Sequence, residues 1–195
     1  MSGTIEAVTQ FSLFGAEAAA PTLGDLDGVL LAGGHWARSR AGARLSVVVA
    51  DRWRGDALAA AFAEREVGGA DAIVAAESGF GVRTAFSKQL LDAAGRWTRG
   101  ANEGLPRGFR LGAGGLRLWA IAAGRRDDAG YLLATAAPND PIHQAAGAQL
   151  SRLGVAAVSL ARGGPGWRVT SAKRLRRLTE LLGPAPAGGE LDWPA

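Results

Sequence analysis

The chain has 195 residues, 48% of them hydrophobic, and a formal net charge of +4, which fits one globular domain or two small halves sharing a core. It contains no cysteine and only two histidines, so disulfides and cysteine nucleophiles are excluded and a zinc site has little scope. No apolar run is long enough for a membrane span and no signal peptide is recognisable, which favours a cytoplasmic protein. Arginines concentrate between acidic ends of the chain, which favours a polyanionic partner.

The first part of the chain is predicted to contain a series of alternating helices and strands after an irregular N-terminal segment. Residues 1–21 lack periodicity and are expected to be a flexible lead-in. The segment 22–97 is predicted to contain a helix over 23–34, a strand over 43–51, a helix over 55–66, a hairpin of strands over 71–78 and 81–87, and a helix over 87–97 capped by Ser87. A Gly-rich linker is expected over 98–112.

The second part repeats this order. The segment 113–183 is predicted to contain a helix over 116–124, a strand over 131–137, a helix over 139–154 capped by Asp140, strands over 155–163 and 166–171, and a helix over 171–183 capped by Ser171. Residues 184–195 are expected to be a flexible tail. Gly81, Arg83, Lys88 and Leu90 match Gly166, Arg168, Lys173 and Leu175 at one constant offset. The pattern indicates an internal duplication, with a chance likeness of two α/β halves as the alternative.

Two helical segments end in small residues, "LDGVLLAGG" at 26–34 and "LRLWAIAAG" at 116–124. Together with the repeated order of elements, they resemble the motif helices of LAGLIDADG homing endonucleases in the single-chain, two-repeat form. The first ending also resembles the degenerate motif of the WhiA family of bacterial sporulation regulators. In the second segment Arg117 and Leu118 replace the small residues through which the motif helices pack. The resemblance implies a monomeric α+β fold, with two similar repeats that form curved antiparallel sheets about a pseudo-twofold axis.

The resemblance also locates the family's catalytic acids. In the family an acid at the end of each motif helix holds a divalent metal against the scissile phosphates. The matching positions are Gly33 and Ala123, and neither can bind a cation. The resemblance therefore implies a DNA-binding scaffold without catalytic residues, metal or cofactor. The alternatives are an active endonuclease whose acids are displaced, a WhiA-like regulator, although no helix-turn-helix signal occurs, and a scaffold that binds proteins.

A DNA-facing surface is implied by the same resemblance, because the family's sheets lie along the major groove of double-stranded DNA. The basic residues expected to contact DNA are Arg38, Arg40, Arg44 and Arg83 in the first repeat, and Arg125, Arg126, Arg162, Arg168, Lys173 and Arg174 in the second. For each of them alone a solvated surface side chain is the favoured interpretation, and the evidence for DNA binding lies in the cluster. Trp36 and Trp167 could stack on a base, but a place in the core is favoured.

The N-terminal segment contains a second motif, "QFSLF" at 10–14. It resembles the Gln-x-Ser/Asp-Leu-Phe peptide by which bacterial polymerases and repair proteins bind the sliding β clamp. The resemblance implies that Leu13 and Phe14 enter a hydrophobic pocket, while Gln10 and Ser12 set the register. The alternative is a short edge strand that packs on the domain. The sequence thus predicts a nucleoid-associated protein that the clamp recruits to replication or repair sites.

Overall fold

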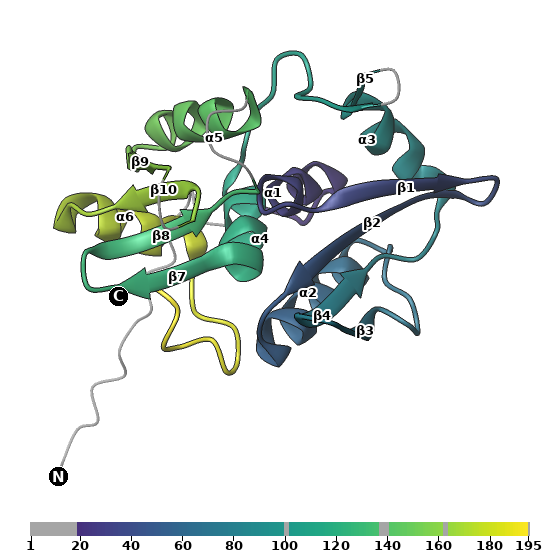
Figure 1. Cartoon of the computed structure of the whole chain (residues 1–195), viewed down its shortest axis with the longest axis horizontal. Coiled ribbons are helices and arrows are strands. Elements are labelled where there is room, and N and C mark those ends of the chain that lie inside the picture. Colours follow the sequence, from purple (N-terminus) through teal and green to yellow (C-terminus); the bar gives the residue numbers. More distant parts are fainter. Residues whose placement is uncertain (1–18, 100–101, 137–140, 162–163, 195) are drawn as a thin grey trace, which may run out of the picture.

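The computed structural model describes residues 19–99, 102–136, 141–161 and 164–194 (Figure 1). The first repeat contains the 3₁₀ helix η2 (Leu23–Leu26), α1 (Asp27–Leu31), β1 (His35–Ser39), β2 (Gly42–Val49), α2 (Arg52–Glu64), β3 (Ile73–Ala76), β4 (Gly79–Arg83), η3 (Lys88–Leu90) and α3 (Leu91–Arg96). The second contains α4 (Ala113–Ala123), β7 (Gly124–Asp127), β8 (Gly130–Ala134), α5 (Pro141–Arg152), β9 (Val158–Leu160), β10 (Gly166–Val169) and α6 (Ala172–Leu182). Two short strands, β5 (Thr98–Arg99) and β6 (Asn102–Glu103), lie between the repeats.

Each repeat forms a four-stranded antiparallel sheet. The strand orders are β1-β2-β4-β3 and β7-β8-β10-β9, so the two sheets have the same topology. Figure 1 shows the sheets on either side of α1 and α4, which lie together at the centre. The expected α+β fold of two similar repeats is therefore confirmed.

The sequence missed one strand in each repeat. β1 and β7 follow directly after α1 and α4 and pair with β2 and β8. Both are short and largely polar, so they lack the apolar alternation that marks a half-buried strand. They are strands because a partner strand satisfies their backbone groups. Each repeat is thus helix, hairpin, helix, hairpin, helix.

The repeats differ in strand register. Arg83 pairs with Ser46, four residues after β2 begins at Gly42, whereas Arg168 pairs with Leu132, two residues after β8 begins at Gly130. Arg83 and Arg168, which match in sequence, therefore lie on equivalent faces of their sheets but at different positions along the paired strands.

Two glycines allow the central helices to approach closely. A Cβ atom built on Gly28 of α1 would lie 1.8 Å from the carbonyl oxygen of Gly115 in α4. The residues that break the motif in α4 do not prevent this contact. Leu118 is buried at 2% exposure, and the guanidinium of Arg117 turns away to donate to the carbonyl oxygens of Leu182 and Pro184.

The C-terminal segment packs on the domain in its described part, unlike the flexible tail expected for 184–195. Trp193 is 4% exposed and donates its indole N–H to the carbonyl oxygen of Gly183 at 2.8 Å. Asp192 forms an ion pair with Arg54 of α2 at 3.2 Å. Figure 1 shows this segment as the yellow loop between the two halves. Within the described ranges, no helix is both long and apolar enough to cross a membrane.

Candidate nucleic-acid interface

The two faces of the first sheet differ in burial. Along β2 the side chains of Leu45, Val47 and Val49 are buried, while those of Ser46 and Val48 between them are not. This alternation follows from the two-residue period of a strand. Helix α2 covers the buried face, because Gly55 of that helix lies against Ile73 and Val82. The opposite face, called the open face here, is the one that carries Ser46 and Val48.

Two of the expected arginines lie on the open face of the first sheet. Arg44 is on this face by alternation, and Arg83 is on it because it pairs with Ser46. The guanidinium of Arg44 lies 4.5 Å from the ring centroid of Phe86, a favourable cation–π contact. Arg83 donates its Nε–H to the carbonyl oxygen of Asp71 at 3.0 Å. Both side chains are therefore oriented by neighbours.

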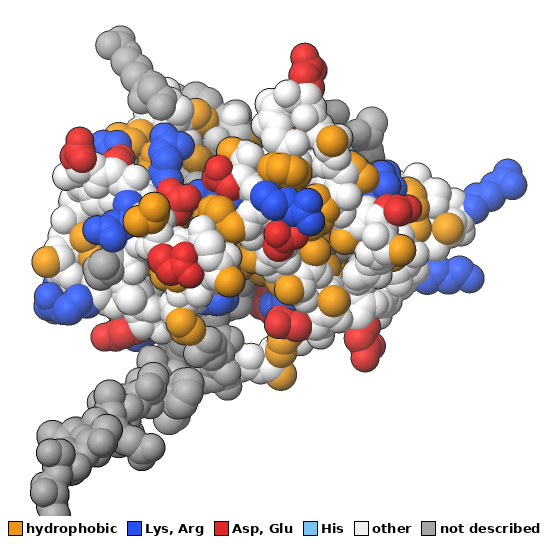
Figure 2. Space-filling view, turned by 90° about the horizontal axis from the view of Figure 1, so that it is seen from below, with side chains coloured by type: hydrophobic (Ala, Val, Ile, Leu, Met, Phe, Trp, Pro, Cys, Tyr) orange, Lys and Arg blue, Asp and Glu red, His pale blue; other side chains and the backbone are white. Residues whose placement is uncertain are grey.

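The other two arginines of the first repeat lie elsewhere. Arg38 pairs with the buried residue Ala43, which places it on the covered face of β1. There it donates to the hydroxyl of Thr98 at 3.1 Å. Arg40 lies exposed in the turn between β1 and β2. Figure 2 shows Lys and Arg side chains projecting from the end of the molecule where this hairpin lies. The β1 positions on the open face are His35, Ala37 and Ser39.

The second sheet presents a similar row. Arg125 and Arg168 both pair with Leu132, one from each neighbouring strand, so all three share a face. Leu132 is itself only 2% exposed, but unlike Tyr131 and Leu133 it is not part of the hydrophobic core cluster. Trp167, opposite Leu133, packs on α5 by donating its indole N–H to the carbonyl oxygen of His143. The face with Leu133 is therefore the covered one, and the face with Leu132 is the open one. Arg125 is exposed.

An acidic neighbour distinguishes Arg168 from Arg125. The guanidinium of Arg168 forms an ion pair with Asp127 at 2.5 Å, and both side chains are about a quarter exposed. Arg126 pairs with Tyr131 and starts on the covered face, although it is exposed. Arg125 is therefore the arginine of this sheet best placed to meet a phosphate.

The remaining predicted contacts have mixed outcomes. Lys173 and Arg174 are exposed in the first turn of α6. Arg162 and the peptide residues Gln10, Ser12, Leu13 and Phe14 lie outside the described residues. Trp36 and Trp167 pack against the hydrophobic core, as the sequence favoured.

Gly33 and Ala123, which the resemblance predicts to stand where the family has its catalytic acids, lie at the ends of the central helices. Gly33 is in the turn after α1 with a φ of 95°, and Ala123 is the last residue of α4. Beside the end of α4 lies Arg54, which is 6% exposed and donates to the carbonyl oxygens of Ile121 and Gly124, each at 2.8 Å. The C-terminal carbonyls of a helix carry partial negative charge, so a buried guanidinium stabilises them.

Among the described residues, no cluster of three or more His, Asp or Glu side chains could hold a metal ion.

Asp27 has a structural role at the other end of α1. Its carboxylate accepts a hydrogen bond from the indole N–H of Trp97 at 2.7 Å and lies 3.4 Å from the guanidinium of Arg96. Desolvation by burial raises the pKa of Asp27 above its ordinary value and outweighs the lowering effects of Trp97 and Arg96. The contacts of Asp27 therefore join α1 to the end of α3.

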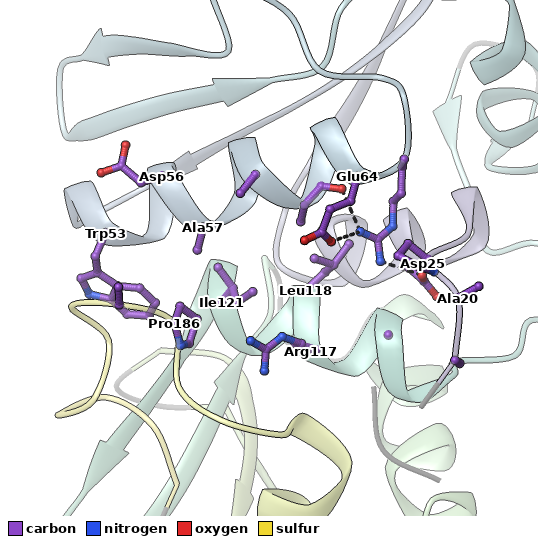
Figure 3. A pocket seen from close by; sticks show the side chains of 17 residues that line it. Ala20, Asp25, Trp53, Asp56, Ala57, Glu64, Arg117, Leu118, Ile121 and Pro186 are labelled. Carbon is purple, nitrogen blue, oxygen red and sulfur yellow. Dashed lines mark hydrogen bonds and ion pairs between the residues drawn. The ribbon is translucent and has the colours of Figure 1, made fainter. Parts of the chain in front are cut away.

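A cleft of about 690 Å³ lies between α2 and α4 on the covered side (Figure 3). Ala57, Leu118 and Ile121 contribute apolar surface, and Asp56 and Glu64 contribute acidic groups. Arg65 and Arg117 also line the cleft, but Arg65 is paired with Asp25 and Arg117 donates to backbone carbonyl oxygens, so neither guanidinium is presented to a phosphate. The cleft is therefore not part of the candidate interface. Figure 2, which views the molecule from below Figure 1, shows acidic and basic side chains intermixed over that face.

Comparison with known proteins gives a structural match alone. No protein-family model and no curated protein matches the sequence. Among solved structures, the chain is similar to the homing endonuclease I-WcaI bound to its DNA recognition sequence, with a TM-score of 0.61 over 92% of this chain and 91% of that one. The chain has a LAGLIDADG-like fold. Because the two sequences are only 9% identical, the likeness establishes this LAGLIDADG-like fold and not an activity.

Several residues of the open faces were not found from the sequence. They are His35, Ser39, Ser46, Val48 and Phe86 in the first repeat and Leu132 and Val158 in the second. None has the charge that drew attention to the arginines. The two-residue alternation through Arg44 would have identified Ser46 and Val48, whereas the strand that contains His35 was itself missed.

Proposed function

We propose that the protein binds double-stranded DNA with the open faces of its two sheets, as a monomer whose repeats meet adjacent segments of the duplex. The observation that supports this most directly is the row of arginines on those faces: Arg44, Arg83, Arg125 and Arg168. A guanidinium suits both phosphate oxygens and the edge of guanine. The similarity to a DNA-bound homing endonuclease supports the same reading.

We infer further that the protein does not cut the DNA it binds. Glycine and alanine at positions 33 and 123 lack any ligand for a divalent cation. Of the acids near the end of α4, Asp51 and Asp192 are paired with Arg54, and Asp127 is paired with Arg168. The sliding β clamp would recruit the protein through Gln10, Ser12, Leu13 and Phe14 to replication or repair sites on the nucleoid. An active endonuclease is the alternative.

DNA binding is tested by fluorescence anisotropy with duplex DNA over a salt series. Arg44→Ala should weaken binding and reduce the slope of log K against log salt by about one, the value for one lost phosphate contact. Arg38→Ala is the matched control, since it removes the same charge from the covered face of the same hairpin. Equal effects of both variants, or affinity that is independent of salt, would contradict the proposed surface.

Clamp recruitment and cleavage need separate assays. The double variant Leu13→Ala, Phe14→Ala should lose retention on an immobilised β clamp and keep its affinity for DNA. Unchanged retention would refute recruitment through this peptide. For cleavage, plasmid is incubated with the protein and magnesium or manganese, and the supercoiled form should persist. Linear product that scales with protein would instead support the active endonuclease.

A further inference from the structure

Val48 is an unusually exposed apolar residue for its place in the fold. It lies on β2, an inner strand that pairs with β1 on one side and β4 on the other. Nevertheless 52% of its surface is exposed, whereas the adjacent residues Val47 and Val49 are 3% and 2% exposed. An inner-strand side chain is ordinarily shielded by cross-strand neighbours on its face. The exposure of Val48 therefore needs a local cause.

The cause is that both flanks of Val48 lack a side chain. On β4 its partner is Gly81, which contributes no side chain to the open face. On the other side β1 begins at His35, which pairs with Ser46, so no strand residue stands beside Val48. Val48 consequently projects from the sheet as an isolated isopropyl group.

The polar surroundings of Val48 indicate what it meets. One step back along the same face lie Ser46 and its partner Arg83, followed by Arg44 over Phe86. Same-face residues of a strand are spaced by about 6.7 Å, which is close to two base-pair steps of about 3.4 Å. If β2 lies along the major groove, Val48, Ser46 and Arg44 would therefore each face a base pair about two steps from the next.

We propose that Val48 contacts the C5-methyl group of a thymine, and so selects an A·T pair at one position of the DNA site. The inference rests on the proposed DNA binding. In the major groove the thymine methyl is the apolar group that distinguishes an A·T pair by contact alone. The isolated side chain of Val48 offers the methyl group an apolar contact, and it has no hydrogen-bond donor or acceptor for other base edges. The selected thymine lies about two base pairs from the pair that faces Ser46.

The test begins with selection of bound duplexes from a random library by the full-length protein. Each thymine of the enriched site is then replaced singly by deoxyuridine, which lacks only the methyl group. One replacement should weaken binding by about fourfold, the effect of losing one buried methyl contact. Val48→Ala should bind the parent duplex with a similar loss and show no further loss at that position. Val48→Ile should retain the discrimination.

Leu191→Ala provides the control. Leu191 is 91% exposed in the C-terminal segment, which packs against α2 away from the open faces, so the change removes an exposed apolar side chain that the proposal does not place against DNA. This variant should keep the deoxyuridine effect that Val48→Ala abolishes. The role of Val48 would be overturned if no deoxyuridine in the enriched site weakens binding, or if the deoxyuridine effect survives in Val48→Ala. Either result would leave the proposed DNA binding intact. Failure to enrich any duplex would overturn the proposed DNA binding as well.

Discussion

Gly28→Ala directly perturbs the contact that joins the two repeats. The added Cβ atom would lie 1.8 Å from the carbonyl oxygen and 2.7 Å from the carbonyl carbon of Gly115. Contacts below 3 Å between such atoms are strongly repulsive, and the oxygen belongs to the backbone of α4, so a helix must shift rather than a side chain. Overpacking a well-packed core costs about 1–3 kcal/mol. We expect the upper end, about 3 kcal/mol, and a melting temperature lower by about 6–12 °C.

Gly55→Ala is the matched control for this change. Gly55 is also buried in a helix, but its added Cβ would meet its nearest neighbours, side-chain atoms of Ile73, at 3.6 Å. That distance is an ordinary contact, so the gain in helix propensity should increase the free energy of unfolding by about 0.5–1 kcal/mol. Urea denaturation of both variants measures the two effects. If the free energy of unfolding of Gly28→Ala lies within about 0.5 kcal/mol of that of the parent protein, the inference that α1 and α4 approach closely at this position is refuted.

Two further expectations concern Asp27 and the C-terminal segment. The raised pKa of Asp27 means that the folded state holds its proton to higher pH than the unfolded state, so its contribution to the free energy of unfolding should fall as pH rises from about 3.9 through the raised pKa. Urea unfolding over a pH series should show that fall in the difference between the parent protein and Asp27→Asn, and a constant or rising difference would refute it. Trp193→Ala should lower the free energy of unfolding by about 3 kcal/mol, because its indole is buried and hydrogen-bonded to the carbonyl of Gly183. Leu191→Ala, at a side chain that is 91% exposed, should change thermal stability little, and equal effects of the two variants would show that the segment does not pack.

Much of the fold follows from local patterns in the sequence. The 3.6-residue rhythm of apolar side chains predicted most of the helices, and β-branched runs predicted strands such as β2. The repeated order predicted two similar halves, which the identical sheet topologies confirm. Local patterns failed for β1 and β7, whose pairing partners create the strand. They failed also for the C-terminal segment, where burial of Trp193 depends on a surface built by distant residues.

The candidate site, like the fold, was predicted in part from the sequence and decided in part by strand pairing. Residue types identified the arginines, and the resemblance to LAGLIDADG motif helices predicted that Gly33 and Ala123 stand at the family's acid positions. Which arginines share a face depends on strand register, a long-range property that separated Arg44 from Arg38. Strand register likewise exposed Val48 beside Gly81. The sequence by itself therefore determined the repeat and its chemistry, whereas only tertiary pairing decided which side chains are presented together to a ligand.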